Sequence, residues 1–223
     1  MPPALTARLL AWASTLPGLL TLATAALSLT PLVVVFSAWL HPDPQLWAHL
    51  WVYVLPSLVG NTLLLGVGVG LGVTVLGVSL GWLTAVCEFP GRRFFSWALL
   101  LPLALPAYVT AFVWVGWLDV TGSVTLWLRS TWGLPGLPFR NGGGVIWVMS
   151  LALYPYVYLT ARTAFQEQGR NLLEAAQSLG LRRRQAFWRV ALPIARPAIV
   201  AGVALALMET LADFGTVAIF NYD

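Results

Sequence analysis

The sequence has no lysine, one cysteine and two histidines, and each scarcity excludes a class of chemistry. Without lysine there is no P-loop lysine, no Schiff-base residue and no kinase lysine. Cys87 stands alone, so an internal disulfide and a CxxC site are both excluded. His41 and His49 do not form the HExxH pair of a zinc protease. We therefore expect no catalytic residue, no metal site and no cofactor.

Charge is also scarce. Charged residues make up 9% of the 223 residues and hydrophobic residues 59%, and the mean hydropathy is +0.80. A soluble domain carries about 25% charged residues, and a disordered chain needs low hydrophobicity. The pI near 9.7 comes from arginines placed between apolar runs, which is typical of membrane topology and not of nucleic-acid binding. The composition predicts an all-α integral membrane protein.

Five apolar runs reach the length of about 20 residues that crosses a bilayer as a helix. They cover residues 16–40, 58–86, 94–118, 145–165 and 197–220. A cytoplasmic N-terminus places ten of the twelve arginines on the cytoplasmic side, as the positive-inside rule requires. The first run continues without a break to Leu40, which favours an uncleaved helix over a signal peptide.

The second run is rich in glycine. Three pairs lie four residues apart, at 66/70, 68/72 and 77/81, so that each pair shares one helix face and lets another helix approach closely. Residues 77–81 also match the hydrolase pattern GxSxG around Ser79. Because that pattern needs a strand–turn–helix context and a histidine partner, helix packing is the favoured interpretation.

The longest polar stretch covers residues 166–196. Asn171 and Glu174 are spaced as an N-cap and an N3 glutamate, and Gly180 supplies a left-handed stop, which predicts a short helix over residues 172–179. A second helix is expected over 182–192, ended by Pro193 and Pro197. Two such amphipathic helices either lie in the membrane interface or dock into a groove of a partner.

Within this stretch, the spacing of Glu174-Ala175-Ala176, Gly180 and Leu192-Pro193 resembles the EAA motif of bacterial ABC importer permeases. The family most often has isoleucine where this chain has Val190. Residues 57–63 are also similar to the start of the type I importer permease domain. We therefore expect an N-terminal transmembrane helix and outer loop over 1–56, and a permease domain over 57–223.

This resemblance implies a polytopic helical bundle of the type I ABC importer permease fold, with about five spans present and the sixth missing. It also implies that the chain is not an enzyme, because a dimeric cytoplasmic ABC ATPase receives the coupling loop and hydrolyses ATP. The other implied partners are an extracytoplasmic solute-binding protein, a second permease half or subunit, and the lipid bilayer. The implied location is the bacterial inner membrane.

Residues 101–109 and 213–217 resemble the ferric-iron importer permeases, so ferric iron is the expected solute. Thiamine, sulfate and phosphonate permeases are the alternatives. Because residue 223 precedes any sixth span, the resemblance further implies a truncated first half, and a truncated fragment that does not transport is another alternative. A different class of function is a membrane scaffold that docks the ATPase without transporting a solute.

Two acids, Glu209 and Asp213, lie four residues apart on one face of the fifth run. An acid at this depth costs a few kcal/mol and therefore faces protein or water. One interpretation places both acids in a translocation path, and the other makes them hydrogen-bonded acids that lock helices together. An intramembrane enzyme that uses Ser79 or these carboxylates is a competing class.

Overall fold

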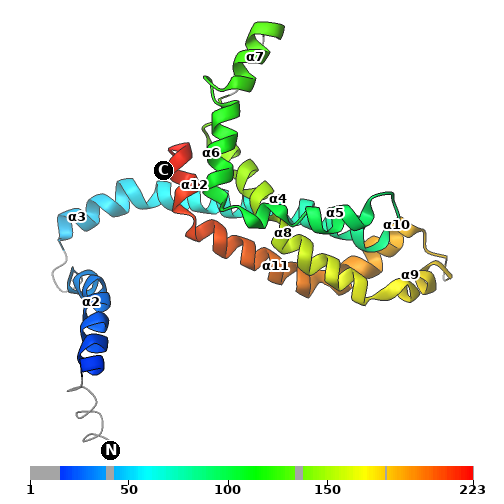
Figure 1. The fold of residues 1–223 in the computed structure, drawn as a ribbon, viewed down its shortest axis with the longest axis horizontal. Helices are drawn as coiled ribbons and strands as arrows, with labels where there is room; N and C mark the ends of the chain where they lie inside the picture. Colours follow the sequence, from blue (N-terminus) through cyan, green and yellow to red (C-terminus); the bar gives the residue numbers. More distant parts are fainter. Residues whose placement is uncertain (1–15, 39–42, 134–137, 179, 223) are drawn as a thin grey trace, which may run out of the picture. The chain divides into compact units, whose positions relative to one another are not determined.

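The computed structural model describes residues 16–38, 43–133, 138–178 and 180–222, and every regular element within them is helical (Figure 1). The predicted all-α class is confirmed. In chain order the elements are α2 (Leu16–Ala38), α3 (Pro44–His49), η1 (Leu50–Val54), α4 (Leu55–Val86), α5 (Arg92–Ala98), η2 (Leu101–Ala104), α6 (Ala107–Leu118), α7 (Ser123–Trp132), α8 (Gly142–Glu167), α9 (Gly169–Ser178), α10 (Arg183–Ala186), η3 (Phe187–Ala191), α11 (Leu192–Ala212) and α12 (Phe214–Phe220).

The contacts within the chain divide it into residues 1–55 and 56–223. In the first unit, α2 is an apolar helix that continues through Pro31, as membrane helices permit. The helix α3 begins after Asp43, whose carboxylate accepts hydrogen bonds from the backbone N–H groups of Gln45 at 2.9 Å and Leu46 at 3.4 Å.

Five segments of the described chain are long and apolar enough to cross a membrane, as predicted from the sequence. They are Pro17–Ser37, Pro44–Val86, Ala107–Trp132, Gly142–Glu167 and Arg184–Ala212. The predicted number is therefore confirmed, but the second, third and fifth segments differ from the prediction in position. The second begins at Pro44 instead of residue 58, because the residues predicted as loop are helical from Pro44 onward.

The third predicted span, residues 94–118, is wrong as one continuous helix. The chain leaves α-helical structure after Ala98, passes through the short 3-10 helix η2 and returns to an α-helix at Ala107. Pro102 and Pro106 explain the interruption, because each lacks an N–H group and Pro106 favours an extended residue before it. Leu105 is indeed extended, with φ −115° and ψ 131°. After the turn that follows Leu118, the short helix α7 extends the third segment to Trp132.

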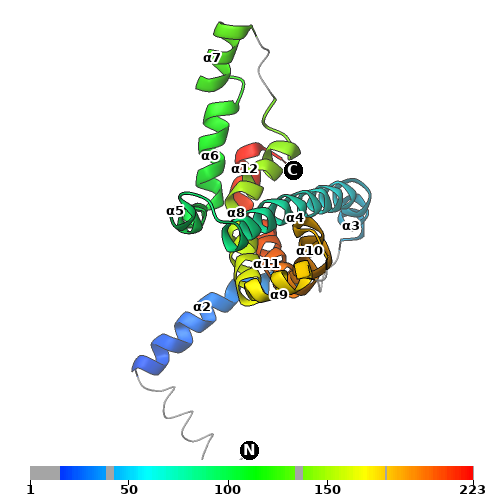
Figure 2. The same ribbon diagram turned by 90° about the vertical axis from the view of Figure 1, so that its right-hand side faces the viewer.

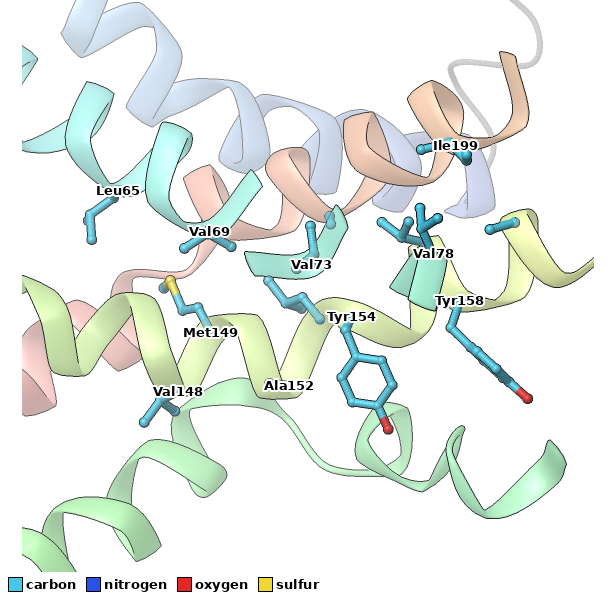
Figure 3. Packing of buried hydrophobic residues seen from close by; sticks show 14 of the residues in the cluster. Leu65, Val69, Val73, Val78, Val148, Met149, Ala152, Tyr154, Tyr158 and Ile199 are labelled. Atoms are coloured by element: carbon cyan, nitrogen blue, oxygen red, sulfur yellow. The ribbon is translucent and has the colours of Figure 1, made fainter. Parts of the chain in front are cut away.

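The helix α8 forms the centre of the second unit, and the core residues of α4 and α11 pack against it (Figure 3). Its fully buried side chains include Val148, Met149, Val157 and Tyr158. Pro155 lies inside α8 and the helix continues through it, as membrane helices permit when neighbouring groups satisfy the freed carbonyl.

The glycines of α4 bring its backbone close to α8. A Cβ atom added to Gly68 would lie 2.5 Å from the side chain of Ile146, and one added to Gly72 would collide with Ser150. The predicted close approach is therefore confirmed on this face, whereas a Cβ at Gly66 would meet open space. The interpretation of Ser79 as part of a hydrolase elbow is wrong, because this residue lies inside the continuous helix α4.

The loop elements and the last helix lie at opposite ends of the α8–α11 pair. Figure 1 shows α9 and α10 together at one end and α12 at the other, and in Figure 2 the end with α9 and α10 faces the viewer. At the α12 end, the hydroxyl group of Tyr222 lies 3.1 Å from Oδ1 of Asn61.

Candidate functional site

The helix α9 of the polar stretch ends in a turn built on Gly180. This residue has a φ of +86°, and its N–H donates to the carbonyl of Gln177 at 2.9 Å. The N–H of Leu181 donates to the carbonyl of Ala176 at 3.1 Å. These two bonds form a Schellman motif, which satisfies the last carbonyls of a helix. The predicted left-handed turn at Gly180 is confirmed.

The predicted start of this helix is wrong. The helix α9 begins at Gly169, directly after the single turn residue Gln168 that follows α8. Asn171 therefore lies inside the helix instead of capping it, and Glu174 lies in the second turn instead of at N3. The side-chain amide of Gln168 connects the turn between α8 and α9 to η3 by donating to the carbonyl of Ala191 at 3.2 Å.

Helical structure from α10 to α11 does not end at Pro193 and Pro197, contrary to the prediction. Between these helices, η3 is a π-helical turn in which the N–H of Leu192 donates to the carbonyl of Phe187. Pro193 then falls in the first turn of α11, where a missing N–H is tolerated. Pro197 lies inside α11, which continues to Ala212.

The residues of the EAA pattern fall into two groups. Glu174 and Ala175 are exposed on α9, whereas Ala176 is only 6% exposed and α9 contacts α10 and η3. Leu192 and Pro193 begin α11 and are half-buried. The arrangement packs one side of α9 against α10 and η3 and leaves Glu174 and Ala175, in the middle of the helix, exposed.

An aromatic cluster that the sequence reasoning missed lies where this loop meets the membrane helices. The ring of Trp82 in α4 lies 5.2 Å from the ring of Phe165 in α8 and 4.7 Å from that of Phe187 in η3, measured between centroids. Both contacts have the edge-to-face geometry that aromatic pairs favour. The sequence does place each of these aromatic residues within a few residues of a helix end. That the three rings contact one another follows only from the packing of the helices.

A cavity of about 300 Å³ lies beside the interrupted third segment. Its lining combines the backbone turn at 102–107 with residues of α8 and with Glu209 of α11. Glu209 is exposed in this chain, and the neighbouring Met208 and Leu211 are 67% and 64% exposed. An exposed carboxylate on a membrane helix requires water or a protein partner in front of it.

Asp213 does not share a helix face with Glu209, because the helix breaks at Asp213 (φ −85°, ψ 88°). Its carboxylate caps α12 instead, accepting hydrogen bonds from the N–H of Thr216 at 3.0 Å and from the hydroxyl of Thr216 at 2.5 Å. Thr216 is fully buried. The prediction of one acidic face over both residues is wrong, because the side chain of Asp213 satisfies the N-terminus of a new helix.

Two tyrosines of α8 hold the interrupted segment beside the cavity. The hydroxyl of Tyr154 donates to the carbonyl of Leu99 at 2.9 Å, and that of Tyr158 donates to the carbonyl of Ser96 at 3.0 Å. Figure 3 shows both rings extending from α8 toward this segment. Carbonyl groups that would lack a helical partner near Pro102 are satisfied in this way.

The sequence profile of the binding-protein-dependent transport system inner membrane component family matches residues 74–221, which include the loop, the cavity and Glu209. The chain belongs to this family.

Three curated relatives show how the similarity is distributed. The Fe(3+)-transport system permease protein FbpB 2 of Haemophilus influenzae is 32% identical over 75% of this chain and 30% of its own length. The sulfate transport system permease protein CysT of Escherichia coli is 32% identical over 77% of this chain and 62% of its own length. The molybdenum transport system permease protein ModB of Escherichia coli is 28% identical over 65% of this chain and 62% of its own length. The chain thus spans under two thirds of each relative, and their names give different solutes.

Proposed function

We propose that this chain is a membrane-spanning permease subunit of an ATP-driven importer and that α9 is its coupling helix. The supporting observation is the geometry of the loop, in which the Schellman turn at Gly180 holds α9 against α10 while Glu174 and Ala175 remain exposed. The chain has no lysine for a P-loop, so ATP is hydrolysed by a separate cytoplasmic ATPase dimer. Glu174 acts in docking and not in catalysis.

The other partners follow from the family. A solute-binding protein delivers the solute on the outer side, and a second permease half or subunit completes the path. The chain lies in the bacterial inner membrane with its N-terminus in the cytoplasm, because ten of its twelve arginines then face inward.

The test of the coupling role exploits the open space around Gly180. A Cβ there would meet nothing within 4 Å, so a substitution acts only through the φ of +86°. Asparagine tolerates this conformation, and Asn221 adopts a φ of 51° in this same chain. Gly180→Val, with a β-branched side chain, is strained there by about 1–2 kcal/mol.

In proteoliposomes that contain the permease, its ATPase and its binding protein, we expect Gly180→Val to lose ATPase association and solute uptake. Gly180→Asn is the matched control and should retain both. Equal uptake by the valine and asparagine variants, with the ATPase bound in both, would reject a coupling role for this turn.

We further propose that the cavity beside Glu209 belongs to the translocation path and that the solute is ferric iron. The supporting observation is a carboxylate at the wall of a 300 Å³ cavity, because a carboxylate attracts a hard cation and repels an oxyanion such as sulfate. Sulfate is the alternative, favoured by relatives named for sulfate transport at the same 32% identity. Asp213, as the cap of α12, supports the path wall without lining this cavity.

Glu209→Gln tests this assignment, since it removes the charge and keeps the shape. We expect uptake of labelled ferric iron to fall about tenfold or more while ATPase association stays unchanged. Asp213→Asn is the matched control, because it removes a charge four residues away and keeps an oxygen for the cap. Unchanged iron uptake in Glu209→Gln would reject the path role, and uptake of sulfate but not iron by the unmodified transporter would reject the solute.

A further inference from the structure

We propose that the aromatic cluster of Trp82, Phe165 and Phe187, hereafter the aromatic cluster, is the contact through which movement of the coupling loop reaches the membrane helices. The proposal rests on the proposed importer function, because it assigns positioning residues to that function.

The first argument is connectivity. The three rings come from three separate helical elements, α4, α8 and η3, and all three pairs are in contact, with the Phe165–Phe187 centroids 6.3 Å apart. Phe165 is only 4% exposed, whereas Trp82 and Phe187 are half-buried and pack against the core. A displacement of η3 therefore moves the ring of Trp82 or opens a gap beside it, since close-packed interiors do not deform continuously.

The second argument is the π-helical turn that carries Phe187. Ala186 and Ala191 are five residues apart and are both buried, at 0% and 1% exposed. A regular α-helix would turn residues five apart to different sides, so the π turn is what allows both to face inward. Single π turns inside α-helices are frequent at functional sites, and this one separates α10 from α11.

The third argument is that the loop elements are joined to one another by hydrogen bonds, whereas the loop meets α4 and α8 through aromatic rings. Gln168 donates to the carbonyl of Ala191 at 3.2 Å, and the N–H of Arg182 donates to the side chain of Gln185 at 2.9 Å, which caps α10. Because α9 also contacts both α10 and η3, the three elements form one packed unit. The aromatic contacts of this unit with α4 and α8 are made by Phe187. The three rings therefore form an interface between the loop and the α4–α8 pair.

Two substitutions of Trp82 separate the ring contact from general burial. Trp82→Leu keeps apolar bulk so that the chain still folds, and it removes the ring. Trp82→Phe keeps a ring. In proteoliposomes with the ATPase and binding protein, we expect Trp82→Leu to bind the ATPase normally and to hydrolyse ATP, while solute taken up per ATP hydrolysed falls about tenfold, within the usual range of coupling between sites. Trp82→Phe should stay within about threefold of the unmodified chain.

The matched control is Trp147→Ala in α8, whose side chain is 54% exposed and outside the aromatic cluster. It should leave uptake per ATP unchanged. A double-mutant cycle of Trp82→Leu with Phe187→Leu then compares the solute taken up per ATP hydrolysed in the two single variants and the double variant. Because both changes break the same contact, the double variant should be no worse than the more impaired single variant.

Three results would overturn the proposal. One is equal coupling in Trp82→Leu and Trp82→Phe, another is loss of ATPase association in Trp82→Leu, which indicates a purely structural role, and the third is multiplication of the two single effects in the double variant. Failure of the importer function itself is distinguishable, because the unmodified chain would then neither bind the ATPase nor take up solute.

Discussion

Replacing the glycines of α4 one at a time by alanine probes the contact between α4 and α8. The four positions Gly66, Gly70, Gly81 and Gly77 lie on one helix and differ in the space that a Cβ would find. It would meet nothing within 4 Å at Gly66, a flexible side chain at 3.6 Å at Gly70, backbone at 3.2 Å at Gly81, and the Cβ of Val157 at 2.6 Å at Gly77. Stability should fall in that order.

The magnitude follows from the distances. Carbon atoms pack best at about 3.5–4.0 Å, so alanine at Gly77 forces α4 and α8 apart by about 1 Å. The backbone nitrogen of Tyr158 is 2.8 Å from the same Cβ and cannot rotate away. Overpacking of this kind costs about 1–3 kcal/mol, and alanine contributes about 0.5–1 kcal/mol of helix propensity at every one of the four positions. The propensity contribution cancels when variants are compared.

Thermal unfolding of the purified variants in one detergent measures the series. We expect Gly66→Ala to be at least as stable as the unmodified chain. Gly77→Ala should be less stable than Gly66→Ala by about 1–3 kcal/mol, which corresponds to several degrees in Tm for a chain of this size. Gly81→Ala should fall between them. If Gly77→Ala and Gly66→Ala unfold at the same temperature, the close approach of α4 and α8 is refuted.

Three further predictions concern two hydrogen bonds and the orientation of the chain in the membrane. Tyr158→Phe removes the donor to the carbonyl of Ser96 and should lower the free energy of unfolding by about 1 kcal/mol, so an unchanged Tm would contradict the hydrogen bond. Asp213→Ala removes the cap of α12 and should cost about 1 kcal/mol, whereas Asp213→Asn keeps an acceptor and should cost less; equal losses would indicate that charge and not capping matters. Cys87, the single cysteine, should react with a membrane-impermeant maleimide in inside-out vesicles and not in intact spheroplasts, and the reverse pattern would reject a cytoplasmic N-terminus.

The sequence by itself determined the properties that depend on composition and on neighbours along the chain. Few charges and long apolar runs require a helical membrane protein, because only internal hydrogen bonding satisfies a backbone in lipid. The left-handed turn at Gly180 and the glycine face of α4 were also readable, since each depends on a residue type at a fixed spacing.

Only the tertiary structure decided where helices break and which side chains meet. The same residue type had opposite outcomes: Pro102 and Pro106 interrupt the third segment, whereas the chain stays helical through Pro193 and Pro197. Pro193 stands in the first turn of α11, where no N–H group is needed, whereas in the interrupted segment the carbonyl groups of Leu99 and Ser96 find partners on another helix. The hydroxyls of Tyr154 and Tyr158 reach an interrupted segment more than fifty residues earlier in the chain.

The candidate site divides in the same way. The turn at Gly180 that ends α9 could be predicted from the sequence, whereas the predicted position of Glu174 at N3 was wrong. The separation of Glu209 from Asp213, the cavity at the interrupted segment and the meeting of Trp82 with Phe187 could not. Each depends on the packing of segments distant in sequence, and periodicity within one helix carries no information about which surface of another helix it will face.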